Sequence, residues 1–103
     1  MEIEVTINNR GNRIEATIAG HLDTVAAQQL AHLIQPLVDD AQKEIEIDCS
    51  GMDYVCSTCL REFLRLRKSV AQKGGSLVLK TIPEAVRNVF VITGFYNLFT
   101  IKS

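Results

Sequence analysis

Three short segments of the chain alternate apolar and polar residues, and this alternation limits the possible folds more than any other feature. The segments are residues 2–7, 13–18 and 44–48. Successive side chains of a strand point to opposite faces of a sheet, so the pattern predicts three strands that each bury one face. Residues 8–12, which include Gly11, lie between the first two strands and are typical of a hairpin turn. The chain therefore opens with an antiparallel pair.

Two long segments with helical periodicity follow. In residues 24–38 the apolar side chains fall on one helical stripe, with Asp23 or Thr24 as the expected N-cap. Pro36 interrupts this stripe and predicts either a kink or a helix that ends early and restarts. A second helix is predicted from Ser57 to Gly74. The side chains expected to face inward are, in order, Val25, Ala26, Leu30, Leu33, Ile34, Leu37, Val38, Leu60, Phe63, Leu64, Val70 and Ala71.

The last third of the chain repeats the order of strand and helix. Residues 76–80 form an apolar strand, and residues 81–84 predict a helix start with a capping box and proline in the first turn. That helix ends at Gly94, with Ala85, Val86, Val89, Phe90 and Ile92 expected to face inward. Residues 98–101 fit either a last strand or a short helical tail. The order β-β-α-β-α-β-α predicts one α/β domain over residues 1–103, with a mixed sheet of a hairpin plus parallel strands and helices packed against it.

Composition excludes several function classes. The 103 residues are 47% hydrophobic and 22% charged, with a formal net charge of −1, so no basic face for nucleic acid is expected. The basic residues between 61 and 68 are interleaved with leucines and are interpreted as a solvated helix face. No apolar run approaches the roughly 20 residues that span a bilayer, and no basic start precedes an apolar stretch. We therefore expect a cytoplasmic protein without direct membrane contact, whose three cysteines are reduced.

Residues 48–60 join a strand end to the start of the clearest helix, where unpaired amides favour anions. One interpretation is purely structural: Ser57 or Thr58 caps the helix, and Cys49, Cys56 and Cys59 are small buried residues. Cys56 and Cys59 also form a C-x-x-C motif, which predicts a reactive thiolate as in thioredoxin-like oxidoreductases. A tryptophan and the thioredoxin-type order of elements before the motif are both missing. Zinc is not expected, because His21 and His32 show no ligand spacing.

The whole chain resembles the sulfate transporter and anti-sigma factor antagonist (STAS) domain. Three segments carry the resemblance: Gly20-His21-Leu22-Asp23, the stretch Asp48-Cys-Ser-Gly-Met-Asp-Tyr-Val-Cys-Ser-Thr-Cys-Leu60, and the closing residues 86–99. The resemblance implies an anti-sigma factor antagonist that has no catalytic activity and needs no cofactor or metal. Its implied partner is an anti-sigma factor with serine kinase activity, which binds the ATP. Phosphorylation would release that partner to recapture a sigma factor. The protein is expected to be a monomer or weak dimer.

The resemblance also implies roles for particular residues. Ser57 stands at the position of the phosphorylated serine, with Thr58 as the fallback hydroxyl. The residues expected to contact the partner are Gly20, Asp23, Asp53, Cys56, Thr58, Cys59 and Arg61.

Two positions depart from the family pattern. Cys56 replaces the usual Asp or Ser, and Cys59 replaces a Gly that would let a kinase approach closely. These departures leave open a STAS subunit of a transporter, lipid-transport or other signalling complex that binds without being phosphorylated. They also raise the hypothesis of redox sensitivity.

Overall fold

The strands form one mixed sheet in the order β1-β2-β3-β4-β5, as described by a computed structural model of residues 3–102. β1 (Glu4–Arg10) pairs antiparallel with β2 (Arg13–Leu22). β3 (Glu44–Val55), β4 (Ser76–Lys80) and β5 (Thr100–Lys102) continue the sheet in parallel. The predicted hairpin followed by parallel strands is therefore confirmed.

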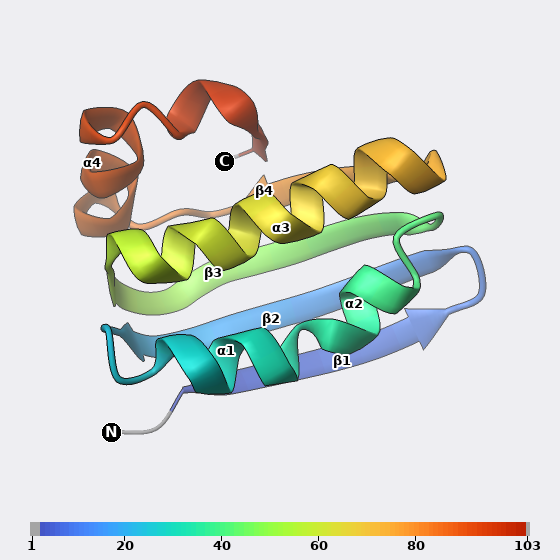
Figure 1. Ribbon diagram of the computed structural model, residues 1–103, viewed down its shortest axis with the longest axis horizontal. Coiled ribbons are helices and arrows are strands. Elements are labelled where there is room, and N and C mark those ends of the chain that lie inside the picture. The colour runs from blue at the N-terminus through green and yellow to red at the C-terminus, as the bar shows by residue number, and fades with distance from the viewer. Residues whose placement is uncertain (1–2, 103) are drawn as a thin grey trace.

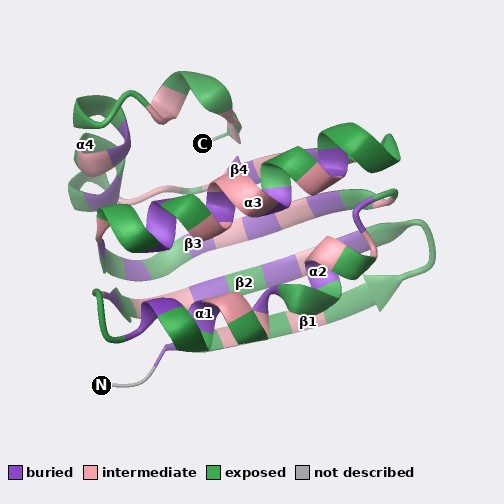
Figure 2. Ribbon diagram, viewed as in Figure 1, coloured by how far each residue is buried: buried purple, intermediate pink, exposed green. Residues whose placement is uncertain are grey.

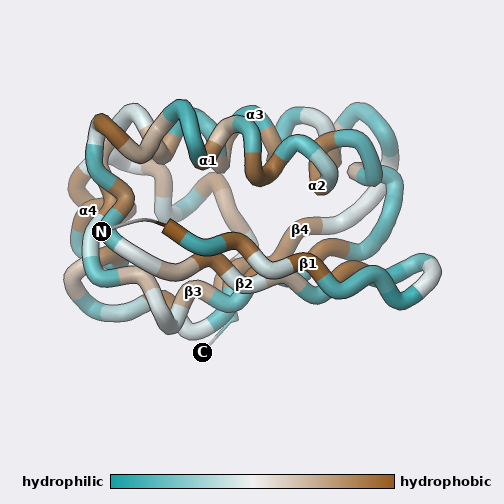
Figure 3. The backbone as a smooth tube through the Cα atoms, turned by 90° about the horizontal axis from the view of Figure 1, so that it is seen from below, coloured by the Kyte–Doolittle hydropathy of each residue, from teal (hydrophilic) through white to brown (hydrophobic). Residues whose placement is uncertain are grey.

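The helices between β2 and β4 lie in one layer over one face of this sheet (Figures 1 and 3). They are α1 (Ala27–Leu33), α2 (Gln35–Asp39) and α3 (Ser57–Lys73). α4 (Glu84–Ile92) lies beside the start of α3, and the short helix η1 (Tyr96–Leu98) leads back to β5 (Figure 1). The start of α3 is thus flanked by α1 on one side and by α4 on the other.

Only the helix-covered face of the sheet is buried, which explains the alternation in the sequence (Figure 2). Ile14, Ile18, Ile45 and Ile47 point into the core. The opposite face carries charges, with Glu46 accepting from Arg13 at 2.7 Å and lying 2.8 Å from the Lys80 ammonium. The hydrogen bond from Lys80, and then the charge of Arg13, hold the pKa of Glu46 below its ordinary value. A polar open face replaces the second helix layer that parallel sheets usually have.

Of the two effects predicted for Pro36, the structure shows the second, a helix that ends early and restarts. α1 ends at Leu33, and the chain restarts as α2 with Pro36 in its first turn, where a missing amide is tolerated. The inward orientation predicted for Val25 is wrong. Residues 24–26 form a turn before α1 begins, and this turn leaves Val25 88% exposed.

In the sequence, Ser50-Gly51 after the alternating residues 44–48 predicts a turn, but this prediction is wrong because β3 continues through it to Val55. The register between β2 and β3 shifts twice here, between Thr17 and Ala19 and between Gly20 and His21. A Cβ on Gly51 would lie 2.7 Å from the Cβ of Ala19, so glycine serves a close approach of two strands. The longer strand carries residues 53–55 to the edge where α3 begins.

The C-terminal segment combines both predicted alternatives, since η1 precedes the short strand β5. The capping box before α4 is wrong: Pro83 is the N-cap, and Thr81 has a φ of 55° and donates its amide to the carbonyl of Lys102 at 3.0 Å. The inward orientation predicted for Ile92 is also wrong, because this residue is 84% exposed, and the same prediction is wrong for Ala71 and Ala85, which are exposed too. α4 is held by Val86 and Phe90, which are both fully buried.

Candidate functional site

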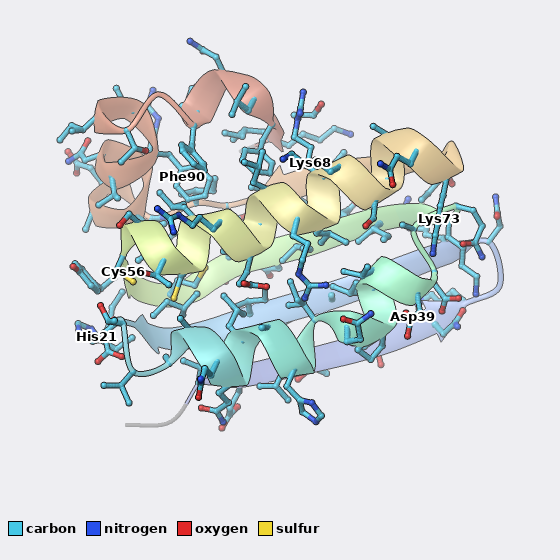
Figure 4. All side chains as sticks on the ribbon, viewed as in Figure 1. His21, Asp39, Cys56, Lys68, Lys73 and Phe90 are labelled. Carbon is cyan, nitrogen blue, oxygen red and sulfur yellow. The ribbon has the colours of Figure 1, made fainter. Side chains whose placement is uncertain are left out.

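The ends of β2 and β3 and the start of α3 meet at one edge of the molecule, which we call the α3 edge (residues 20–25 and 53–61). The amide of Cys56 donates to the carbonyl of Leu22 at 2.8 Å and joins its two halves. His21 and Cys56 both lie at this end, opposite Asp39 and Lys73 (Figure 4). Gly20 lies just inside the edge, with a φ of 117° at the register shift that precedes His21. The structure thus gathers the predicted site residues from three elements.

Ser57 is the first residue of α3 and is exposed to solvent. Cys56 before it is the N-cap, in an extended conformation, and the first turn holds no acidic residue. The free amides and partial positive charge of the helix start therefore favour an added anion at Ser57. Arg61 is exposed one turn further along, at the i+4 spacing that places it on the same helix face as Ser57. Thr58 is exposed as well.

The turn after β2 is tied to the start of α3. One carboxylate oxygen of Asp23 accepts from the amide of Ala26 at 3.0 Å, which holds the turn. The Cys59 thiol donates to the carbonyl of Asp23 at 3.4 Å, and the Thr24 hydroxyl donates to the Cys56 sulfur at 3.9 Å. Both cysteines of the C-x-x-C motif therefore contact this turn.

A second cluster at the α3 edge was missed in the sequence. The imidazole Nδ1 of His21 lies 2.9 Å from a carboxylate oxygen of Asp53, and its ring stacks on Tyr54 at a centroid distance of 4.7 Å. In the sequence, His21 and Tyr54 stand in two separate motif segments, and nothing there relates the two side chains. Their pairing depends on the register shift after Gly20, which no local pattern shows. Tyr54 is 40% exposed and, with Val25, adds apolar surface to this edge.

The three cysteines have different environments. Burial raises the pKa of Cys49 to about 12. Burial, and then the interaction of the protonated Cys59 thiol with the Cys56 sulfur and its charge, raise the pKa of Cys59 to about 12. Partial burial also acts to raise the pKa of Cys56, but the amide and thiol of Cys59, the Thr24 hydroxyl and the Thr58 amide favour its thiolate more strongly. The pKa of Cys56 therefore lies below the ordinary value.

We expect iodoacetamide to alkylate Cys56 first in the folded protein. Because its pKa is lowered, Cys56 forms a thiolate at lower pH than an ordinary thiol does. The pH at which its alkylation rate is half-maximal should therefore be lower in the folded protein than in the unfolded chain. Peptide mapping after a pH series measures this, with Cys49 and Cys59 as internal controls that stay unmodified. A midpoint equal to that of the denatured chain would contradict the assigned environment.

The prediction that Cys59 contributes to a contact surface is corrected by its placement. Its side chain is 0% exposed, because the third residue of the helix turns toward the core. For the same reason, a cysteine in place of the family's glycine does not crowd the outer surface around Ser57. Asp53, Cys56, Thr58 and Arg61 all remain accessible at least in part, and Asp23 is half-buried.

Residues 3–102 contain neither a cluster of metal-binding side chains nor a membrane-spanning helix. No group of three or more His, Cys, Asp or Glu side chains is arranged to hold a metal ion. Within the same residues, every helix is too short or too polar to traverse a bilayer.

Comparison with known proteins identifies the family. A family model described as "Mlab, STAS domain" matches residues 5–100. The chain belongs to the STAS domain family. An anti-sigma-B factor antagonist of Bacillus subtilis is 31% identical, over 100% of this chain and 94% of that protein. The structure of an anti-sigma factor antagonist from Mycobacterium paratuberculosis superposes on this STAS domain with a TM-score of 0.83 at 20% identity, covering 98% of this chain and 86% of that one. The structure of the anti-sigma factor antagonist SpoIIAA in its unphosphorylated form superposes with a TM-score of 0.75 at 15% identity. The match covers 97% of this chain and 89% of that one.

Proposed function

We propose that this STAS domain is an anti-sigma factor antagonist that binds an anti-sigma factor through the α3 edge and is switched by phosphorylation of Ser57. The observation that carries the proposal is the exposed hydroxyl of Ser57 at the first position of α3, on a chain 31% identical over its full length to an anti-sigma-B factor antagonist. The partner is an anti-sigma factor with serine kinase activity, which binds the ATP.

The surface around Ser57 suits a protein partner. Val25 and Tyr54 expose apolar side chains beside polar Thr58 and charged Arg61, a composition typical of interface centres with polar rims. Asp53 and His21 hold Tyr54 in place by hydrogen bonding and stacking. The partner can thus bury apolar side chains of the α3 edge, which also carries the serine.

The same geometry explains how a phosphate switches binding. A phosphate adds about −1.5 to −2 charges, which the helix start and Arg61 accommodate in the free protein. In the complex, that charge would be desolvated against Val25 and Tyr54, at a cost that opposes binding. Phosphorylation therefore stabilises the free form relative to the complex.

The test is intact mass spectrometry after incubation with ATP, Mg²⁺ and the anti-sigma kinase encoded nearest to this chain. We expect one added phosphate on the wild type and on Thr58→Ala, a matched control at the neighbouring exposed hydroxyl, and none on Ser57→Ala. Phosphate retained by Ser57→Ala would overturn the assignment of the serine. Kinase binding without phosphate on any variant would instead favour a STAS subunit that binds unmodified, as the Cys56 replacement allows.

A further inference from the structure

We propose that Cys56 and Cys59 form a redox-sensitive pair, which hydroperoxides oxidise to a disulfide across the first turn of α3. The proposal concerns thiol chemistry at the α3 edge and stands independently of the anti-sigma assignment.

The geometry places two cysteines with different roles at the N-cap and in the first turn of α3. Cys56 is the helix N-cap and is partly exposed, whereas Cys59 lies three residues on and is fully buried. Both sulfurs contact the turn after β2, since the Cys59 thiol donates to the Asp23 carbonyl at 3.4 Å and the Cys56 sulfur accepts from the Thr24 hydroxyl at 3.9 Å. A partly exposed sulfur at a helix start, where the free amides and partial positive charge favour a thiolate, is the site that a peroxide attacks. The buried neighbour is the resolving thiol, which needs no access to solvent to react inside the molecule.

The two thiols are oxidised to the disulfide in two steps. The Cys56 thiolate attacks one oxygen of the peroxide, the O–O bond breaks, and Cys56 becomes a sulfenic acid, while the other oxygen leaves as water or an alcohol after taking up the proton that the Cys56 thiol released on ionising. The Cys59 sulfur then attacks the Cys56 sulfur, the S–O bond breaks, and the hydroxide leaves as water with the proton of Cys59. Two thiols lose two electrons and the peroxide gains them. Conversion of Cys56 to a neutral sulfenic acid also removes the charge that helps to raise the pKa of Cys59.

Oxidation would release the turn after β2. In the reduced protein two hydrogen bonds hold this turn to α3. The Cys59 thiol donates to the Asp23 carbonyl, and the Thr24 hydroxyl donates to the Cys56 sulfur. A disulfide has no thiol proton to donate and carries no negative charge to accept the Thr24 hydroxyl. Both contacts are therefore lost or weakened, and the turn bearing Val25 loosens. An effect of this loosening on partner binding would rest on the proposed function.

The test uses the full chain with hydrogen peroxide, followed by denaturation, N-ethylmaleimide and peptide mapping. The reduced protein has three free thiols, so we expect one maleimide, on Cys49, and a disulfide between Cys56 and Cys59 that dithiothreitol reverses. Cys49→Ala, the matched control at the third cysteine, should still form that disulfide. Cys59→Ala should stop at a sulfenic acid on Cys56 that dimedone traps, and Cys56→Ser should not oxidise.

Hydrogen exchange supplies a second readout. Amides of residues 22–27 should exchange faster in the oxidised wild type than in the reduced protein, while the core strands stay protected. Three maleimides on peroxide-treated wild type, a disulfide that includes Cys49, or oxidation that persists in Cys56→Ser would each overturn the proposal. A disulfide without faster exchange at residues 22–27 would overturn the release of the turn.

Discussion

Replacement of Phe90 by alanine is expected to lower the free energy of unfolding by about 3 to 5 kcal/mol, the usual cost of deleting a buried phenyl ring. Phe90 is 0% exposed and packs edge-to-face on Phe63 of α3 at 6.0 Å and on Phe99 at 5.8 Å between ring centroids. One substitution therefore leaves a cavity and removes two aromatic contacts. Urea denaturation followed by circular dichroism, with linear extrapolation to water, measures the change.

Val91→Ala is the matched control for this substitution. Val91 is the next residue of α4 but is 50% exposed, so its truncation should change stability by about 0.5 kcal/mol or less. Similar losses from both variants would contradict the placement of α4. Because Phe90 contacts the helix that begins at Ser57, a stable but loosened Phe90 variant should also show faster hydrogen exchange at the start of α3.

The fold could be predicted from the sequence because the sheet is buried on one face only. Residues 13–18 and 44–48 therefore alternate between apolar and polar side chains, whereas strands of a sheet covered on both faces would be apolar throughout. Errors arose where one residue supports two structures. Gly51 was interpreted as a turn, although it serves the close approach of β3 to β2. Val25 and Ile92 were placed inward, because their periodicity was extended past the residues where the helices bury a face.

The site could be predicted only in part. Ser57 and its neighbours came from resemblance to a family and from the expected strand-to-helix junction. The cluster of His21, Asp53 and Tyr54 could not be predicted, because it depends on a register shift between two strands. The inward direction of Cys59 depends on the helix starting at Ser57. Resemblance therefore located the edge, while the orientation of each side chain required the structure.

Val25→Asp is expected to weaken binding of the anti-sigma factor by about tenfold to a hundredfold, or 1.4 to 2.8 kcal/mol, without destabilising the protein. Val25 is 88% exposed, so the folded chain loses almost no apolar burial. In the complex, the new carboxylate would be buried without a partner next to Ser57, which imitates the charge of a phosphate at the same edge. Isothermal titration calorimetry with the unphosphorylated protein measures the affinity, and thermal unfolding checks the fold.

Ile92→Asp is the matched control, because Ile92 is 84% exposed but lies at the last residue of α4. It introduces the same charge and removes a comparable apolar side chain, so general effects of acidity or lost hydrophobic surface would appear in both variants. We expect its affinity to stay within about threefold of the wild type, roughly 0.7 kcal/mol. Equal losses from both substitutions would place the partner on a wider surface that includes α4. If Val25→Asp binds with unchanged affinity, the partner does not bind at the α3 edge, even if Ser57 is phosphorylated.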